Sequence, residues 1–159
     1  MRYHRRVPGT FRPVAAMDYF LTGGFRVWFA TNIIGIIPVK RGSGKEGGNP
    51  LQLADEALGR GEILVIFPEG ARGEPETLQT FKKGIGHLAG ARPSVPVVPI
   101  FLHGLGKALP RGSLLLVPFN VTVSVGEPLY GTKSYDAFVT ELTQAMTALA
   151  AAEKLPAWE

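Results

Sequence analysis

The chain contains five consecutive apolar residues, Ile63 to Phe67, and this run constrains the fold more than any other feature. The run is short, rich in β-favouring residues and preceded by Gly61, so it predicts a strand that is buried on both faces. Pro68 follows directly and cannot donate a hydrogen bond to a neighbouring strand, so the strand is expected to end there.

Charged residues and a glycine come immediately after this strand, as Glu69, Gly70 and Arg72. In open α/β sheets, ligands bind beyond the carboxyl ends of the strands. A guanidinium there could bind an anion while the carboxylate accepts hydrogen bonds from hydroxyl groups. An Arg–Glu pair that stabilises a surface turn would use the same residue types. The cluster alone leaves both interpretations open.

The rest of the chain alternates between strand-like and helix-like segments, which predicts an α/β fold. At 159 residues, a single domain over residues 1–159 is expected. We predict a mixed central sheet flanked by helices. Besides 63–67, the expected strands are 11–16, 36–39, 97–102, 114–117 and 120–125. The expected helices are 18–34, 49–58, 80–89 and 134–153. The helix over 49–58 has Asn49 as its N-cap, and Gln52 completes a capping pattern. The helix over 134–153 carries apolar residues at helical spacing, namely Phe138, Val139, Leu142, Met146 and Leu149.

Composition narrows the possible partners only in part. The chain has no cysteine, which excludes disulfides, thiolate metal sites and a cysteine nucleophile. Its net charge of +4 suits an anionic partner, whether a phosphate, an acidic membrane surface or nucleic acid. The glycine-rich loop 42–48 lacks the glycine and hydroxyl spacing of a phosphate-binding loop, because Val39 and Glu46 occupy those positions. No recognised nucleic-acid-reading module is present either.

Four further segments accompany the FPEGAR sequence (67–72). They are IIPVKR (36–41), FKKG (81–84), VPVVPI (95–100) and GEPL (126–129). Together these segments resemble the second to fourth motifs of the glycerophospholipid acyltransferases, the lysophosphatidate acyltransferase family. The resemblance runs from about Arg12 to Leu129. The chain has Ala71 and Gly73 where the family usually has Thr and Ser, so two hydroxyls that could contact the substrate are absent.

The resemblance implies a glycerol-phosphate acyltransferase-like fold and a set of substrate contacts. By this resemblance, Arg41 and Arg72 bind the substrate phosphate, with Lys82 and Lys83 as further phosphate contacts. Glu69 and Gly70 belong to the substrate-contacting motif. No metal and no cofactor are implied, and acyl-CoA or acyl carrier protein serves as co-substrate.

The family's general base is a His followed five positions later by an Asp, and this chain has no such pair. Gly9, Arg92 and Ala108 stand five positions after His4, His87 and His103, respectively. Two explanations remain open: the chain is N-terminally truncated, with the pair upstream of Met1, or it is a paralogue that binds without catalysing. The first is expected, because the later motifs are present. His103 could act as a replacement base, although a structural histidine is the more common case.

The expected function is transfer of an acyl group to a lysophosphatidate-like glycerol hydroxyl, with this chain alone inactive. The alternative is a non-catalytic binder of acidic lipids or phosphate metabolites. The expected partners are a lysophospholipid or glycerol phosphate, the acyl donor and a peripheral membrane surface, with no nucleic acid. The expected location is cytoplasmic and peripheral to the membrane.

Overall fold

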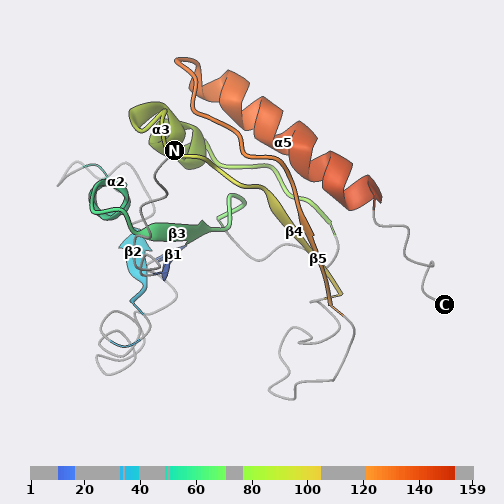
Figure 1. The fold of residues 1–159 in the computed structure, drawn as a ribbon, viewed down its shortest axis with the longest axis horizontal. Helices are drawn as coiled ribbons and strands as arrows, with labels where there is room; N and C mark the ends of the chain where they lie inside the picture. Colours follow the sequence, from blue (N-terminus) through green and yellow to red (C-terminus); the bar gives the residue numbers. More distant parts are fainter. Residues whose placement is uncertain are drawn as a thin grey trace, which may run out of the picture. The chain divides into compact units, whose positions relative to one another are not determined.

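The computed structural model describes residues 11–16, 33, 35–39, 49, 51–70, 77–104 and 121–152 (Figure 1). The chain divides into two compact units, Met1–Ala71 and Arg72–Glu159, which are described separately below. The expected helix over 18–34 and the expected strand over 114–117 lie outside the described residues, apart from Ile33. The expectation of a single domain stays a prediction.

The first unit contains a three-stranded sheet in which every pair is parallel. Strand β1 (Phe11–Ala16) lies at its centre, between β2 (Ile37–Val39) and β3 (Ile63–Ile66). In register, Val14 is opposite both Ile37 of β2 and Ile66 of β3. The predicted bounds of β1 are confirmed, while β2 and β3 are each one residue shorter than predicted. Parallel pairing, with a helix between β2 and β3 in the chain, confirms the predicted α/β class.

Helix α2 (Gln52–Gly59) lies between β2 and β3 in the chain, as expected for a crossover that joins two parallel strands of one sheet. Ala54 and Ala57 are its fully buried residues, and such small side chains allow a helix to pack closely. The predicted capping pattern is wrong in detail. Asn49 precedes the helix by several residues and accepts a hydrogen bond from the Leu51 N–H through Oδ1 at 3.0 Å. The Gln52 amide donates forward to Glu56 at 3.0 Å instead of reaching back.

Within the described residues, strand β3 is covered on one face only, which differs from the predicted burial on both faces. Leu64 and Ile66 are half-buried, whereas Ile63, Val65 and Phe67 are 44%, 40% and 64% exposed. Helix α2 packs against β3. The described residues leave the second face open, which a sequence pattern of continuous apolar residues cannot reveal.

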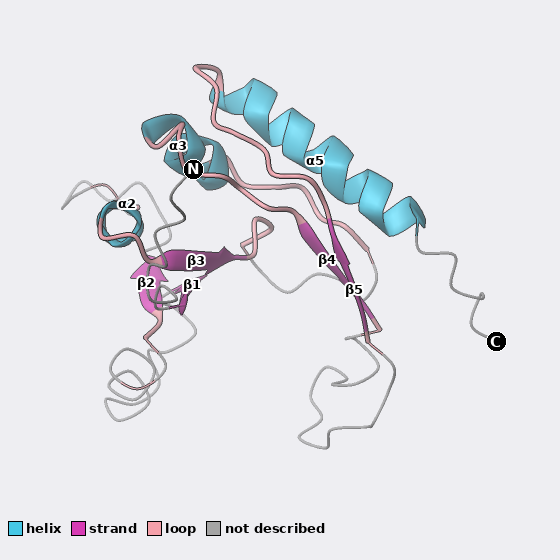
Figure 2. Ribbon diagram, viewed as in Figure 1, coloured by secondary structure: helices cyan, strands magenta, loops and turns pink. Residues whose placement is uncertain are grey.

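The second unit contains an antiparallel pair, β4 (Ile100–His103) and β5 (Thr122–Val125), with Ile100 opposite Val125 (Figure 2). The predicted strand began three residues earlier, at Val97. Val97 instead forms an isolated antiparallel bridge with Leu129, through two hydrogen bonds of 2.8 Å. Pro99 separates this bridge from β4, because it has no N–H to donate, although its carbonyl accepts a hydrogen bond from Gly126 at 2.9 Å.

The core of the second unit lies where helix α5 (Tyr135–Ala152) contacts helix α3 (Gly84–Ala91) and strand β4. Phe138 is fully buried, and Phe81, Ala89 and Leu142 join it in one cluster. Val139 and Met146 pack against this cluster, so the predicted apolar face of α5 is confirmed.

Helix α3 begins later than predicted, at Gly84 rather than near Thr80. Phe81 is only 6% exposed and belongs to the core cluster, so the chain enters the core before the helix begins. Lys83 is the N-cap residue, and Lys82 precedes the helix. Within the described ranges, no helix is both long enough and apolar enough to cross a membrane.

Candidate functional site

The carboxyl edge of the parallel sheet carries two of the predicted site residues. Strands β1, β2 and β3 run in the same direction and end at Ala16, Val39 and Ile66, so the segments that follow them emerge at one edge. Glu69 and Gly70 come directly after β3 at this edge. The predicted position of Glu69 and Gly70, at the carboxyl end of a parallel strand, is therefore confirmed.

The backbone turns sharply at Gly70 and requires a glycine there. Its φ angle is 70°, in the left-handed region that residues with a side chain rarely adopt. The N–H of Gly70 donates to the carbonyl of Phe67 at 3.1 Å, which closes the turn after β3. Glu69 lies within this turn and is half-buried. The glycine of the FPEG sequence thus has a conformational reason to be present.

The two predicted phosphate-binding arginines, Arg41 and Arg72, lie outside the described residues. In sequence, Arg41 comes two positions after Val39, the last residue of β2. Strand β2 ends at the same edge as β3, which agrees with the expected site as far as the strand directions go. The convergence of the two guanidiniums stays a prediction.

The two predicted lysine contacts have different surroundings. Lys83 forms an ion pair with Asp136 of α5, with 2.9 Å between Nζ and Oδ1, and both side chains are largely exposed. Lys82 is also exposed, and no hydrogen-bond or ion-pair partner for it is found within the parts of the chain that the structure describes. The sequence alone could not distinguish the two, because Asp136 is distant along the chain. A phosphate contact from either lysine stays a prediction.

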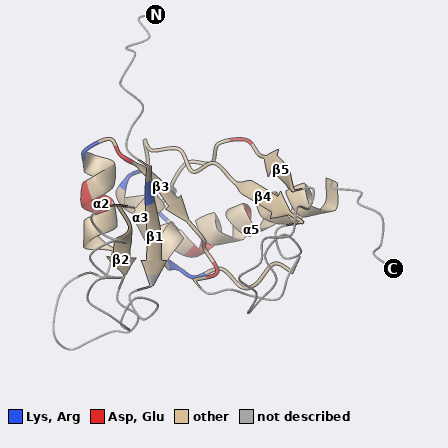
Figure 3. Cartoon of the chain, turned by 90° about the horizontal axis from the view of Figure 1, so that it is seen from below, with Lys and Arg blue, Asp and Glu red and all other residues tan. Residues whose placement is uncertain are grey.

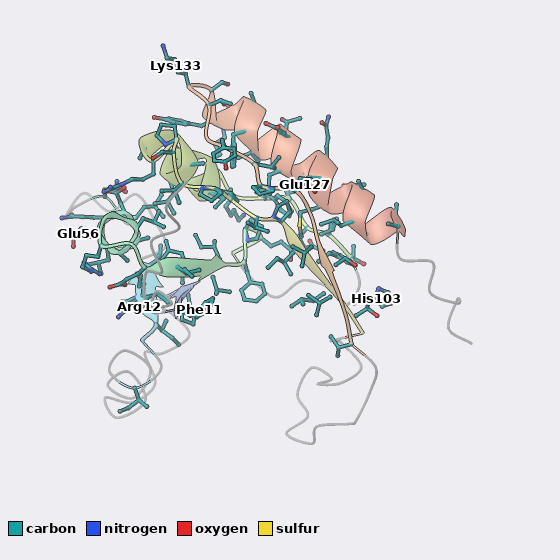
Figure 4. The ribbon with its side chains drawn as sticks, in the orientation of Figure 1. Phe11, Arg12, Glu56, His103, Glu127 and Lys133 are labelled. Carbon is teal, nitrogen blue, oxygen red and sulfur yellow. The ribbon has the colours of Figure 1, made fainter. Side chains whose placement is uncertain are left out.

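A second charged cluster, which the sequence analysis missed, lies at the opposite, amino-terminal edge of the parallel sheet and includes Arg12, which is labelled in Figure 4. Glu62 directly precedes β3; its Oε1 lies 2.9 Å from Nε of Arg60, and its Oε2 lies 3.7 Å from Nε of Arg12 on β1. The hydrogen bond from Arg60, aided by the charges of Arg60 and Arg12, lowers the pKa of Glu62. The parallel register of β1 and β3 brings Arg12 and Glu62 together, and no local pattern signals it.

His103 is the last residue of β4 rather than a residue beyond the strand. Its ring lies 6.4 Å from the Phe101 ring, tilted by 47°, and the histidine is half-buried. Phe101 is 7% exposed, so His103 shares the covered face of β4. A role as replacement base stays untested. The described residues contain no group of three or more His, Cys, Asp or Glu side chains that could hold a metal ion.

Comparison with known protein families identifies the class of protein. The profile of the Acyltransferase family matches residues 1–103, which include strands β1 to β4, so the chain belongs to the acyltransferase family.

Several individual relatives carry the name 1-acyl-sn-glycerol-3-phosphate acyltransferase. The chain is 37% identical over 109 residues to a chloroplastic 1-acyl-sn-glycerol-3-phosphate acyltransferase of Brassica napus, covering 68% of this chain and 31% of that protein. The corresponding Arabidopsis thaliana protein is also 37% identical over 109 residues, with 68% of this chain and 30% of that protein covered. The chain thus spans about a third of the length of these curated relatives.

A solved structure shows the same fold. The 1-acyl-sn-glycerophosphate acyltransferase PlsC of Thermotoga maritima superposes with a TM-score of 0.68 at 21% identity, covering 95% of this chain and 59% of that one. The similarity extends the fold assignment beyond residue 103, where the family profile ends, to most of the chain.

Proposed function

We propose that this chain provides the phosphate-binding part of an O-acyltransferase that acts on a lysophosphatidate-like acceptor. The acyl donor is a thioester, on coenzyme A or acyl carrier protein. The FPEG sequence at the carboxyl edge of a parallel sheet, in a chain of the acyltransferase family, carries this proposal. The names of the Brassica napus and Arabidopsis thaliana relatives support the choice of acceptor.

The residues divide the binding task by their chemistry. Arg41 and Arg72 bind the phosphate, since the planar guanidinium matches phosphate oxygens with two parallel hydrogen bonds. Glu69, held beside the Gly70 turn, accepts a hydrogen bond from a glycerol hydroxyl. Lys82 adds a positive charge near the phosphate. The bound acceptor is thereby oriented, which is a large part of what an enzyme contributes to a two-substrate reaction.

The chemical step needs a group that this chain lacks. The acceptor hydroxyl attacks the thioester carbonyl, its proton passes to a base, and the thiol leaves with a proton. In the 159 residues, no His has an Asp five positions later. We propose that the base–orienter pair comes from outside these residues, and that these residues alone bind the acceptor without turning it over. Attachment at a membrane surface, where a lysophospholipid resides, belongs to the same proposal.

The absence of a His–Asp pair at this spacing from the 159 residues also favours one alternative function, a binder of acidic lipids or phosphate metabolites that performs no chemistry. Both functions require the anion site, and they differ only in turnover once a base is supplied. The binding experiment below therefore tests what they share, and the turnover measurement that closes the Discussion separates them.

Calorimetry with lysophosphatidate tests the shared anion site. Arg72→Ala should weaken binding more than Lys82→Ala, because a two-point charged contact outweighs a single charge on a flexible stem. The loss for Arg72→Ala should be about tenfold or more. Glu141→Gln, an exposed change on α5, is the matched control and should bind like the parent chain. Equal losses for the two basic-residue variants, or no binding by the parent, would contradict the assignment.

A further inference from the structure

The two adjacent lysines of the FKKG segment are held differently, although their sequence suggests one shared role. Lys83 pairs with Asp136 at 2.9 Å. Because a carboxylate accompanies its ammonium, an anion that approached Lys83 would also meet the negative charge of Asp136. Lys82 has no such companion among the described residues. With the described residues as neighbours, Lys82 presents a net positive charge to a ligand and Lys83 does not.

Helix α3 is docked closely on the start of α5, next to this ion pair (Figure 1). A Cβ added at Gly86 would come within 2.7 Å of the Tyr135 carbonyl oxygen, and one added at Gly90 would overlap the Tyr135 ring. The ring of His87 lies 4.3 Å from the same Tyr135 ring. The first turn of α5 therefore meets α3 along a face that carries two glycines, and side chains at those positions would separate the helices.

The chain is also fixed on the other side of Lys82. Phe81 is 6% exposed and packs in the cluster that contains Phe138 and Leu142 of α5. Lys82 thus stands between a residue anchored in the core and a residue paired with α5. The backbone at Lys82 is held from both sides, while its side chain is exposed.

We infer that Lys83 is a positioning residue rather than a phosphate contact. Together with Asp136 and Tyr135, it fixes the start of α3 to α5, so that Lys82 makes the lysine contact to the substrate phosphate. The inference rests on the proposed function and assigns different roles to two residues that the sequence analysis treated alike. It also gives α5 a part in the site, although α5 lies beyond residue 103, where the family profile ends.

A charge swap distinguishes positioning from contact. The full 159-residue chain is compared with Lys82→Gln, Lys83→Gln, Asp136→Asn and the double variant Lys83→Asp with Asp136→Lys, by calorimetry with lysophosphatidate. Lys82→Gln should weaken binding by about tenfold or more. Lys83→Gln should cost less than about fivefold, since an exposed ion pair contributes little. The swap, which rebuilds the pair with its charges exchanged, should restore affinity to within about twofold of the parent.

Several outcomes would overturn the inference. A phosphate contact from Lys83 would make the swap bind as weakly as Lys83→Gln or worse, because residue 83 would then carry a negative charge. It would also make Asp136→Asn bind more tightly than the parent, because the variant releases the ammonium. Equal losses for Lys82→Gln and Lys83→Gln without rescue by the swap would likewise contradict it. No binding by the parent chain would overturn the proposed function as well, so the two failures are distinguishable.

Discussion

The two units of the chain bury apolar surface in different ways. In Met1–Ala71, the described buried residues are Ile37, Ala54 and Ala57, and one face of β3 is open. In Arg72–Glu159, Phe138 and Leu142 of α5 form a buried cluster with Phe81 and Ala89. The first unit presents the motif turn at the edge of a sheet covered on one face, while the second presents the motif lysines beside a packed core. Two different kinds of packing, a sheet covered on one face and a closed core, therefore each fix the backbone beside a part of the binding motif.

Charge also distinguishes the sheets of the two units. Strands β4 and β5 carry no Lys, Arg, Asp or Glu (Figure 3). Their outward residues form a continuous apolar face, with Ile100 opposite Val125 and Leu102 opposite Val123. The first unit instead ties β1 to the start of β3 with the Arg12–Glu62–Arg60 cluster. Electrostatic perturbations of the sheets should therefore affect β1–β3, and core truncations should affect the second unit.

The largest expected effect comes from two matched phenylalanine truncations. Phe138→Ala removes a fully buried ring and should destabilise its unit by about 3–5 kcal/mol. Phe11→Ala removes a ring that is 61% exposed and should cost less than about 1 kcal/mol. Hydrogen exchange, read separately for the amides of β4–β5 and β1–β3, gives both values. Similar losses of protection for the two variants would show that the open face of the first unit is covered in solution.

The same contrast explains how much of the fold the sequence could predict. The bounds of β1 and the apolar face of α5 follow from local patterns, and both are confirmed. The exposed face of β3 does not follow, because an apolar run such as Ile63–Phe67 has the same composition whether one face or two are covered. The late start of α3 depends on Phe81 entering the core, which only tertiary contacts decide.

The candidate site was predictable to a similar extent. The position of Glu69 and Gly70 after a strand could be predicted, because the turn residues are adjacent in sequence to the strand. The pairing of Lys83 with Asp136, and of Arg12 with Glu62, could not, because each pair joins distant segments through helix packing or strand register. The roles of Arg41, Arg72 and Lys82 remain predictions that binding measurements decide.

A smaller effect is expected from acid at the parallel sheet of the first unit. The folded-state pKa of Glu62 is lowered, so its ion pairs stabilise the fold above the ordinary glutamate pKa, and this contribution is lost as the pH falls through the lowered value. Glu62→Gln should remove that part of the pH dependence while preserving the shape of the side chain. Hydrogen exchange of β1–β3 amides between neutral and acidic pH measures it, with Glu56→Gln on α2 as the exposed control. Identical pH profiles for parent and Glu62→Gln would contradict the assigned role of the cluster.

The most direct test of the account is turnover of an acyl thioester with lysophosphatidate as acceptor. It is measured for the 159-residue chain and for the same chain extended ahead of Met1 by a segment that contains a His-x-x-x-x-Asp pair. A positioned general base typically contributes about 10²–10⁴-fold, so the 159-residue chain should stay near background and the extended one should exceed it by a factor of that order. Arg72→Ala in the extended chain should lower the rate again. Robust turnover by the 159-residue chain, abolished by His103→Ala, would contradict the account and identify His103 as the base.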